Sequence, residues 1–94
     1  MHAVLTHVSI SDYEAARKML HSDVMPMVKQ APGFVTGGWL APADGKSGEG
    51  VSVEVFESED AARSFVERFE SQGQPDASLV TVSKIEVREV AGNT

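Results

Sequence analysis

Residues 2–10, with the sequence HAVLTHVSI, alternate large apolar side chains with other residues in the manner of a β-strand. The alternation puts Val4 and Val8 on one face of this strand and Leu5 and His7 on the other. Both faces of the predicted strand therefore carry large apolar groups, and His7 shares a face with Leu5.

Three further segments have the same two-residue period. Residues 34–41 are predicted to form a second strand, which a polar turn with the sequence PADGKSGEG follows. The segment VSVEVF points three valines to one face and Ser52, Glu54 and Phe56 to the other. In the last predicted strand, residues 79–90, the apolar phase changes midway, which indicates a β-bulge or a crossing onto another subunit.

Two segments have the period of an α-helix. Ser11 and Glu14 are spaced as a capping box, which predicts that the first helix starts there. Pro26 predicts a kink or a restart within this helix, and Gly33 ends it. The apolar stripe of the first helix comprises Ala16, Met19, Leu20, Val24, Met27, Val28 and Ala31. That of the second helix, which Ser58 caps, comprises Ala62, Phe65, Val66 and Phe69.

The order β-α-β-β-α-β predicts a ferredoxin-like α+β fold, with a four-stranded antiparallel sheet and both helices on one face. A chain of 94 residues is long enough for one domain and too short for two, so residues 1–94 are predicted to form a single domain. Two helices cover only one face of such a sheet, although both faces are apolar. We therefore expect a homodimer in which two sheets pack face to face.

Charge and composition narrow the possible partners. The chain has 8 basic and 14 acidic residues, a net charge of −6, so a nucleic-acid partner is not expected. The absence of cysteine excludes disulfides and thiolate chemistry. No apolar run approaches the length of a membrane span, and the first residues lack the pattern of a signal peptide. We therefore expect a cytoplasmic protein without a membrane partner.

Three motifs, MPMV, APGFVTGGWL and VEVFESEDAARSFV, resemble the corresponding segments of the dimeric α+β barrel superfamily. Within it, the chain is most similar to small antibiotic-biosynthesis-monooxygenase-like proteins, and the resemblance covers essentially the whole sequence. The resemblance implies a cavity between the helices and the sheet. Members of the superfamily include cofactor-independent monooxygenases, haem-degrading enzymes, isomerases and decarboxylases, so the fold does not fix the activity.

The haem degraders of this superfamily use an Asn on the first strand, a Trp in a W-E-S motif and a His on the second helix. Here His7 stands near the position of the Asn, Phe56 replaces the Trp, and the second helix has no His. The resemblance therefore argues against haem degradation. Cofactor-independent monooxygenases need only an apolar cavity, one or two polar groups that deprotonate a phenol or hydroquinone, and room for oxygen. The residues predicted to supply this set are His7 as the catalytic group and Trp39, Phe56 and Tyr13 as substrate-binding residues.

Each candidate has an alternative structural role. His7 is either a proton acceptor, because an imidazole titrates near neutral pH, or an inert histidine of the strand. Trp39 follows Gly37 and Gly38, whose missing side chains leave space for either a ligand or a partner subunit. Glu54 is either a base with a raised pKa or, as its valine neighbours favour, an ion-paired residue at the edge of a dimer interface.

Three functions follow as expectations. The first, which the resemblance favours, is a monooxygenase without a cofactor that acts on a small aromatic or quinol-type compound. The second is a protein that binds a small apolar or aromatic molecule without catalysis, in a stress-related role for example. The third is a dimeric scaffold without a ligand. No motif has the spacing of metal ligands, so no metal site is predicted.

Overall fold

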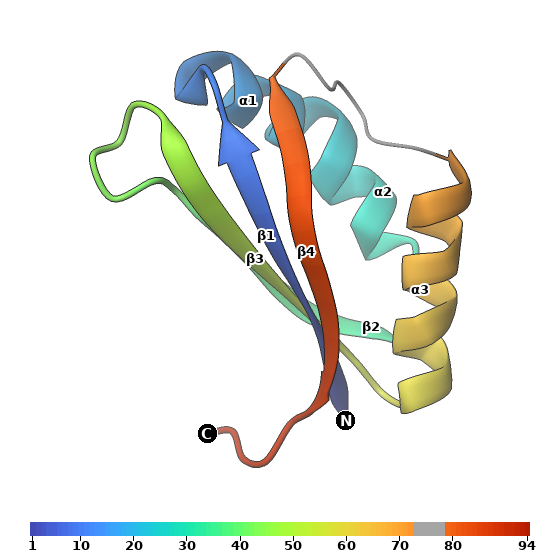
Figure 1. Ribbon diagram of the computed structural model, residues 1–94. Helices are drawn as coiled ribbons and strands as arrows, with labels where there is room; N and C mark the ends of the chain where they lie inside the picture. The colour runs from blue at the N-terminus through green and yellow to red at the C-terminus, as the bar shows by residue number, and fades with distance from the viewer. Residues whose placement is uncertain (73–78) are drawn as a thin grey trace.

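A computed structural model describes residues 1–72 and 79–94 of the chain, with Gln72 described by its backbone alone. Four antiparallel strands form one sheet, in the spatial order β2-β3-β1-β4. Figure 1 shows that the helices all lie on one side of this sheet, which leaves its other face without a covering layer. The strands are β1 (His2–Ile10), β2 (Phe34–Leu40), β3 (Gly48–Phe56) and β4 (Val80–Glu89). The fold is the predicted ferredoxin-like arrangement.

The first helical region consists of three consecutive segments, α1 (Tyr13–Met19), a π-helical turn η1 (Leu20–Val24) and α2 (Met25–Lys29). The predicted capping box at Ser11 is wrong, because Asp12 is the N-cap and its carboxylate accepts a hydrogen bond from the Ala15 amide at 3.2 Å. The predicted restart is confirmed, since α2 begins at Met25 with Pro26 in its first turn. A proline has no amide hydrogen to donate to the preceding turn, which explains why the hydrogen-bond pattern changes there.

Helix α3 (Glu59–Gln72) begins where the Ser58 hydroxyl accepts a hydrogen bond from the Ala61 amide at 3.1 Å, as predicted. Its apolar stripe packs on the core, in which Phe56, Val4, Val28 and Ala62 are at most 1% exposed. The Phe56 ring lies edge-on to Phe34 and tilted against Phe65, with centroids 5.9 and 5.1 Å away. The core therefore lies near the end of the sheet at which β3 meets α3.

Two β-bulges decide which side chains face the helices. In β4, Ser83 is the extra residue, because His7 pairs with Lys84 while Val8 pairs with Val82. This bulge is one of the two explanations that were predicted for the change of apolar phase. It puts the apolar residues of both halves of β4 on the helix side. In β2, Val35 is the extra residue between Phe34 and Thr36.

The second bulge corrects the predicted faces of β2. Regular alternation would place Phe34 and Trp39 on opposite faces, whereas the bulge at Val35 brings both to the helix side.

The face of the sheet that the helices leave uncovered is called the open face here. It carries Leu5 and His7 of β1, the three valines of β3 (Val51, Val53 and Val55) and Leu40 of β2. Leu40 is 62% exposed and Val35 is 49% exposed, so large apolar groups reach solvent on this side. Within the described residues, no helix combines the length and the apolarity that crossing a membrane requires.

Candidate functional site

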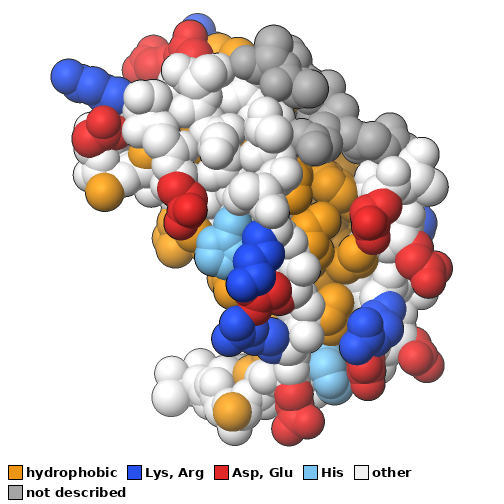
Figure 2. Space-filling model, viewed as in Figure 1, with side chains coloured by type: hydrophobic (Ala, Val, Ile, Leu, Met, Phe, Trp, Pro, Cys, Tyr) orange, Lys and Arg blue, Asp and Glu red, His pale blue; other side chains and the backbone are white. Residues whose placement is uncertain are grey.

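A cavity of about 150 Å³ lies between the sheet and the helical layer. Figure 2 shows part of the apolar surface that borders the space between the sheet and α3. The sheet contributes Val4, Thr6, Val8, Ile10, Trp39, Ser52, Glu54, Val80 and Ile85 to the lining. Leu40 and Val51, which belong to the open face by their positions in the ladder, border the cavity as well. The helices contribute Tyr13, Ala16, Arg17, Met19, Leu20, Val24, Met27, Val28, Phe65, Val66 and Phe69, and the β2–β3 loop adds Ala41. The lining is predominantly apolar, as in most sites for small organic molecules.

The π-helical turn places side chains over this cavity. Leu20 and Val24 mark the two ends of η1, and both line the cavity together with Met27 of α2. A π-helical turn widens the helix locally, and such turns are frequent at functional sites. The predicted apolar stripe of the first helix therefore faces the cavity as well as the core.

Glu54 is the acidic residue in the cavity wall. Its residue surface is only 4% exposed, and burial raises the pKa of its carboxyl to about 7, although a hydrogen bond with the Ser52 side chain opposes this rise. One of its oxygens, Oε2, is buried without a hydrogen-bond partner among the described residues. A buried carboxyl oxygen without a partner is costly and is poised to accept a proton from a ligand.

This environment corrects the favoured interpretation of Glu54 as an ion-paired residue at a dimer edge. Glu54 lies on the helix side of β3, opposite Val4 of β1, and no cationic group of the described residues pairs with it. The alternative reading of this residue, a base with a raised pKa, agrees with its position.

Trp39 lies in the cavity wall beside Glu54. In the ladder between β2 and β3, Trp39 pairs with Ser52 and Gly37 pairs with Glu54. A Cβ atom added at Gly37 would stand 3.2 Å from the Trp39 ring, so the indole folds back over Gly37 toward the position of Glu54. Gly37 is thus the residue whose missing side chain makes room for the indole.

Gly38 differs from Gly37 in the face of the sheet on which it leaves space. It lies on the open face, where an added Cβ would meet no atom within 4 Å. Gly37→Val should therefore push the indole into the cavity and change the Trp39 emission spectrum. Gly38→Val should leave the emission unchanged, and equal spectral changes in the two variants would contradict this assignment.

The structure separates the four predicted site residues. Tyr13 and Trp39 line the cavity. Phe56 does not, because its ring is fully buried in the core between Phe34 and Phe65. The structure therefore does not bring Phe56 together with Tyr13 and Trp39, since no face of the ring is left for a ligand.

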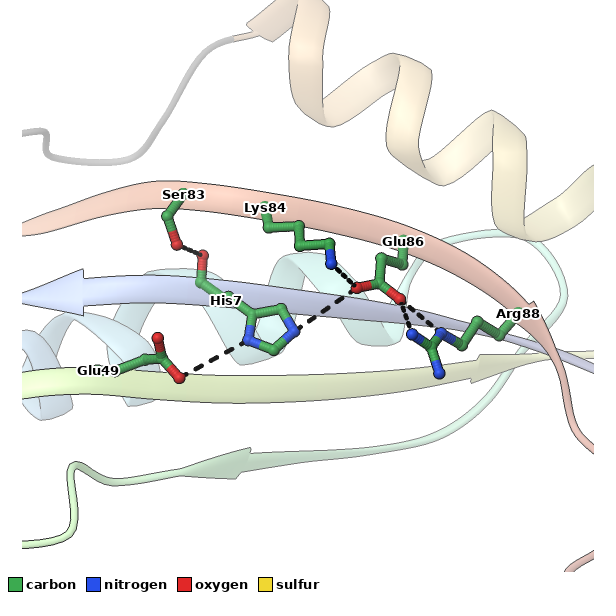
Figure 3. A network of polar contacts seen from close by, with 6 residues as sticks. All are labelled: His7, Glu49, Ser83, Lys84, Glu86 and Arg88. Atoms are coloured by element: carbon green, nitrogen blue, oxygen red, sulfur yellow. Dashed lines mark hydrogen bonds and ion pairs between the residues drawn. The ribbon is translucent and has the colours of Figure 1, made fainter.

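His7 lies on the open face and does not border the cavity. Figure 3 shows its ring between two carboxylates, with Nδ1 3.8 Å from Glu49 Oε1 and Nε2 3.9 Å from Glu86 Oε1. Glu86 also pairs with Lys84 and Arg88, whose hydrogen bonds lower the pKa of its carboxyl. His7 and Trp39 therefore do not border one space as expected. Successive side chains of a strand point to opposite faces, and His7 of β1 points away from the helices.

Three polar residues that were not candidates from the sequence also line the cavity, and Thr6 of β1 is one of them. Ser52 neighbours Glu54 on β3, and Arg17 lies on α1. The spacing of Ser52, Glu54 and Phe56 already placed the first two on the same face as a core aromatic residue. That shared face was the available signal for a buried acid.

No protein-family model matches the chain, and no curated protein matches it either. Solved structures do. HapK from Hahella chejuensis is 13% identical with a TM-score of 0.75, over 100% of this chain and 96% of its own. SnoaB, a cofactor-independent oxygenase from Streptomyces nogalater solved as a mutant, is 17% identical with a TM-score of 0.74, over 98% of this chain and 94% of its own.

A third similar structure is that of the heme-degrader MhuD from Mycobacterium tuberculosis, with two hemes bound in its active site. It is 21% identical, with a TM-score of 0.61, and the match covers 97% of this chain and 98% of MhuD. These identities are low, so the similarity concerns the fold and not the activity. The chain shares the ferredoxin-like fold of these solved structures, which agrees with the fold that the resemblance of its sequence implied.

Proposed function

We propose that the protein is a cofactor-independent monooxygenase that oxidises a small phenol or quinol-type compound in the cavity between sheet and helices. One observation carries this proposal: the wall of a predominantly apolar cavity contains Glu54, a buried carboxyl with a pKa of about 7 and an oxygen without a hydrogen-bond partner among the described residues. A general base works best when its pKa lies near the working pH, because it is then both ionised and basic.

The proposed reaction starts with proton transfer. Ionised Glu54 takes the hydroxyl proton of a phenol, and the resulting phenolate is a far better electron donor than the phenol. Molecular oxygen accepts the electrons and bonds to the free ring carbon opposite the hydroxyl group. Loss of water then leaves a quinone. Phenol and O₂ thus give quinone and H₂O, and each product contains one of the two atoms of O₂.

The size and the lining of the cavity support a small aromatic substrate. A buried apolar cavity of about this volume binds benzene in another protein. Here the cavity measures about 150 Å³, and the indole of Trp39 and the ring of Tyr13 are part of its wall. Aromatic rings in these positions offer edge and face contacts to a bound ring. The fold similarity to SnoaB, itself a cofactor-independent oxygenase, agrees with this function.

We also propose that the protein is a homodimer that buries the open face. Val53 lies at the centre of this face, where it pairs with Leu5 on one side and with Gly38 on the other. A twofold axis through such a surface brings apolar groups of two copies together and covers the exposed side chains of β2 and β3.

A second candidate function is binding without catalysis. The predominantly apolar lining of the cavity favours it, because most of the wall offers no group that could take part in a reaction. The two functions predict the same ligand class and differ in whether oxygen is consumed.

Oxygen uptake with 2-methylphenol and 1-naphthol as substrates tests the proposal. The expected result is consumption of one O₂ per quinone formed, without release of hydrogen peroxide, since the second oxygen atom leaves as water. Release of one hydrogen peroxide per O₂ consumed would indicate instead that oxygen only accepts electrons and is not inserted into the substrate. Quenching of Trp39 fluorescence by these phenols without any oxygen uptake would reject the enzymatic function and favour the second candidate, binding without catalysis.

A further inference from the structure

The described part of the cavity wall contains one cationic residue. Among the described residues that line it, Arg17 of α1 is the one base and Glu54 the one acid. Arg17 is exposed, whereas Glu54 is 4% exposed. The two charged residues of the wall therefore differ in depth, because Arg17 lies at the surface and Glu54 is buried.

Arg17 makes no ion pair with the described part of the chain. Arg63 pairs with Glu59, and Arg88 pairs with Glu86, whereas no carboxylate among the described residues lies within ion-pair distance of Arg17. A guanidinium presents a planar set of donors that matches a carboxylate with two parallel hydrogen bonds. Arg17 thus keeps this donor set available at the edge of an apolar cavity.

The cavity is long enough to separate the two polar ends of a ligand. Glu54 pairs with Val4 near the start of β1, and the lining continues along the same strand to Ile10. This part of the wall covers several strand residues and is therefore longer than a phenol ring. Helix α1, which contains Arg17, lies at the end of β1 (Figure 1), whereas Glu54 pairs with Val4 near the start of that strand.

We infer that the substrate is an elongated aromatic acid, whose carboxylate binds Arg17 and whose phenol ring lies inside the cavity at Glu54. Charge fixes this direction, because an ionised Glu54 would repel a second carboxylate placed next to it. The net charge of −6 disfavours anions in general, so an anionic substrate needs a local base such as Arg17. The inference rests on the proposed function only in taking this cavity as the substrate site.

Equilibrium binding without oxygen tests the inference apart from catalysis. The probes are 3-(4-hydroxyphenyl)propanoate and its neutral amide, titrated under nitrogen at pH 8 with Trp39 emission as the readout. The acid is expected to bind about tenfold more tightly than the amide, because a charged hydrogen-bonded pair is formed only with the acid. In Arg17→Gln the preference should disappear, through loss of affinity for the acid alone.

Lys18→Gln is the matched control. Lys18 is the exposed neighbour of Arg17 on α1, carries the same charge and does not line the cavity. The preference for the acid should survive in this variant, which separates a specific contact from the general effect of removing one positive charge. Equal binding of acid and amide to the unmodified protein, an acid preference that persists in Arg17→Gln, or no binding of either probe would overturn the inference. Binding with the expected preference but without oxygen uptake would instead reject only the enzymatic function.

Discussion

Glu54→Gln is expected to lower oxygen-dependent turnover by about 100-fold or more and, at the same time, to stabilise the folded protein above pH 7. The loss of turnover follows because the amide has no basic oxygen that could take the phenol proton, and a positioned base typically contributes 10²- to 10⁴-fold, roughly, to such a step. In the unmodified protein, kcat/KM should rise with pH through an apparent pKa of about 7, as the Glu54 carboxyl ionises.

The stability effect follows from the same raised pKa. In the unfolded chain the carboxyl titrates near 4.5, and in the folded protein near 7. Between these values the folded state holds a proton that the unfolded state has lost, so stability falls as pH rises through this window. Above pH 7 the ionised buried carboxyl lowers the free energy of unfolding by up to ~3 kcal/mol. A neutral glutamine at this position does not have this effect.

Chemical denaturation at pH 5 and pH 8 measures this effect. The unmodified protein should lose stability between the two pH values, whereas Glu54→Gln should lose much less. Glu59→Gln is the control, because Glu59 is exposed and its hydrogen bond with Arg63 lowers the pKa of its carboxyl. The stability that Glu59 contributes is present above the unfolded pKa and is lost as the pH falls. Glu59→Gln should therefore lower the stability at pH 8, whereas Glu54→Gln should raise it. Turnover that survives in Glu54→Gln would reject Glu54 as the base.

The second large effect is expected at the open face. The protein should sediment with twice the mass of the 10.1 kDa chain, and Val53→Glu should raise the dissociation constant of the dimer by about 100-fold or more. A twofold axis introduces the new carboxylate twice, and both copies lose their water without gaining a partner. Val53 is suited to this test because it lies between Leu5 and Gly38 in the ladder of the open face.

Ser64→Glu adds the same charge to the exposed surface of α3, in the other layer of the molecule, and should leave the mass unchanged. Sedimentation of both variants at micromolar concentration distinguishes the face-to-face dimer from other assemblies. An unmodified protein that is a stable monomer, or a Val53→Glu variant that stays dimeric, would contradict the proposed interface.

The sequence allowed most of the fold to be predicted because local signals are strong here. The alternation in β1 and β3 agrees with the structure, and so do the apolar stripe of the first helical region and the restart at Pro26. The π-helical turn at Leu20 was not predicted. The start of the first helix was misplaced by one residue. Ser11 and Asp12 are both good caps, and only the geometry of the turn selects between them.

The site was harder to predict, since a strand pattern defines two faces without saying which one the helices cover. Leu5 and His7 on one side and Val4 and Val8 on the other are both compatible with a buried face. The helices cover the side of Val4, which puts Glu54 in the cavity wall and His7 outside it. The chemical properties of histidine drew attention to His7, whereas burial, which no single sequence position displays, gives Glu54 its altered pKa.

The two β-bulges have an evolutionary consequence. Val35 and Ser83 are single extra residues on the edge strands of the sheet, and each resets the side on which its neighbours point. Deletion of Ser83 would turn half of β4 over in a single step, whereas no substitution could exchange so many side chains between the two faces. In descendants of this chain, a one-residue deletion at Ser83 is therefore expected to be selected against, because it would turn Lys84, Glu86 and Arg88 toward the helices in place of the core residues Ile85 and Val87.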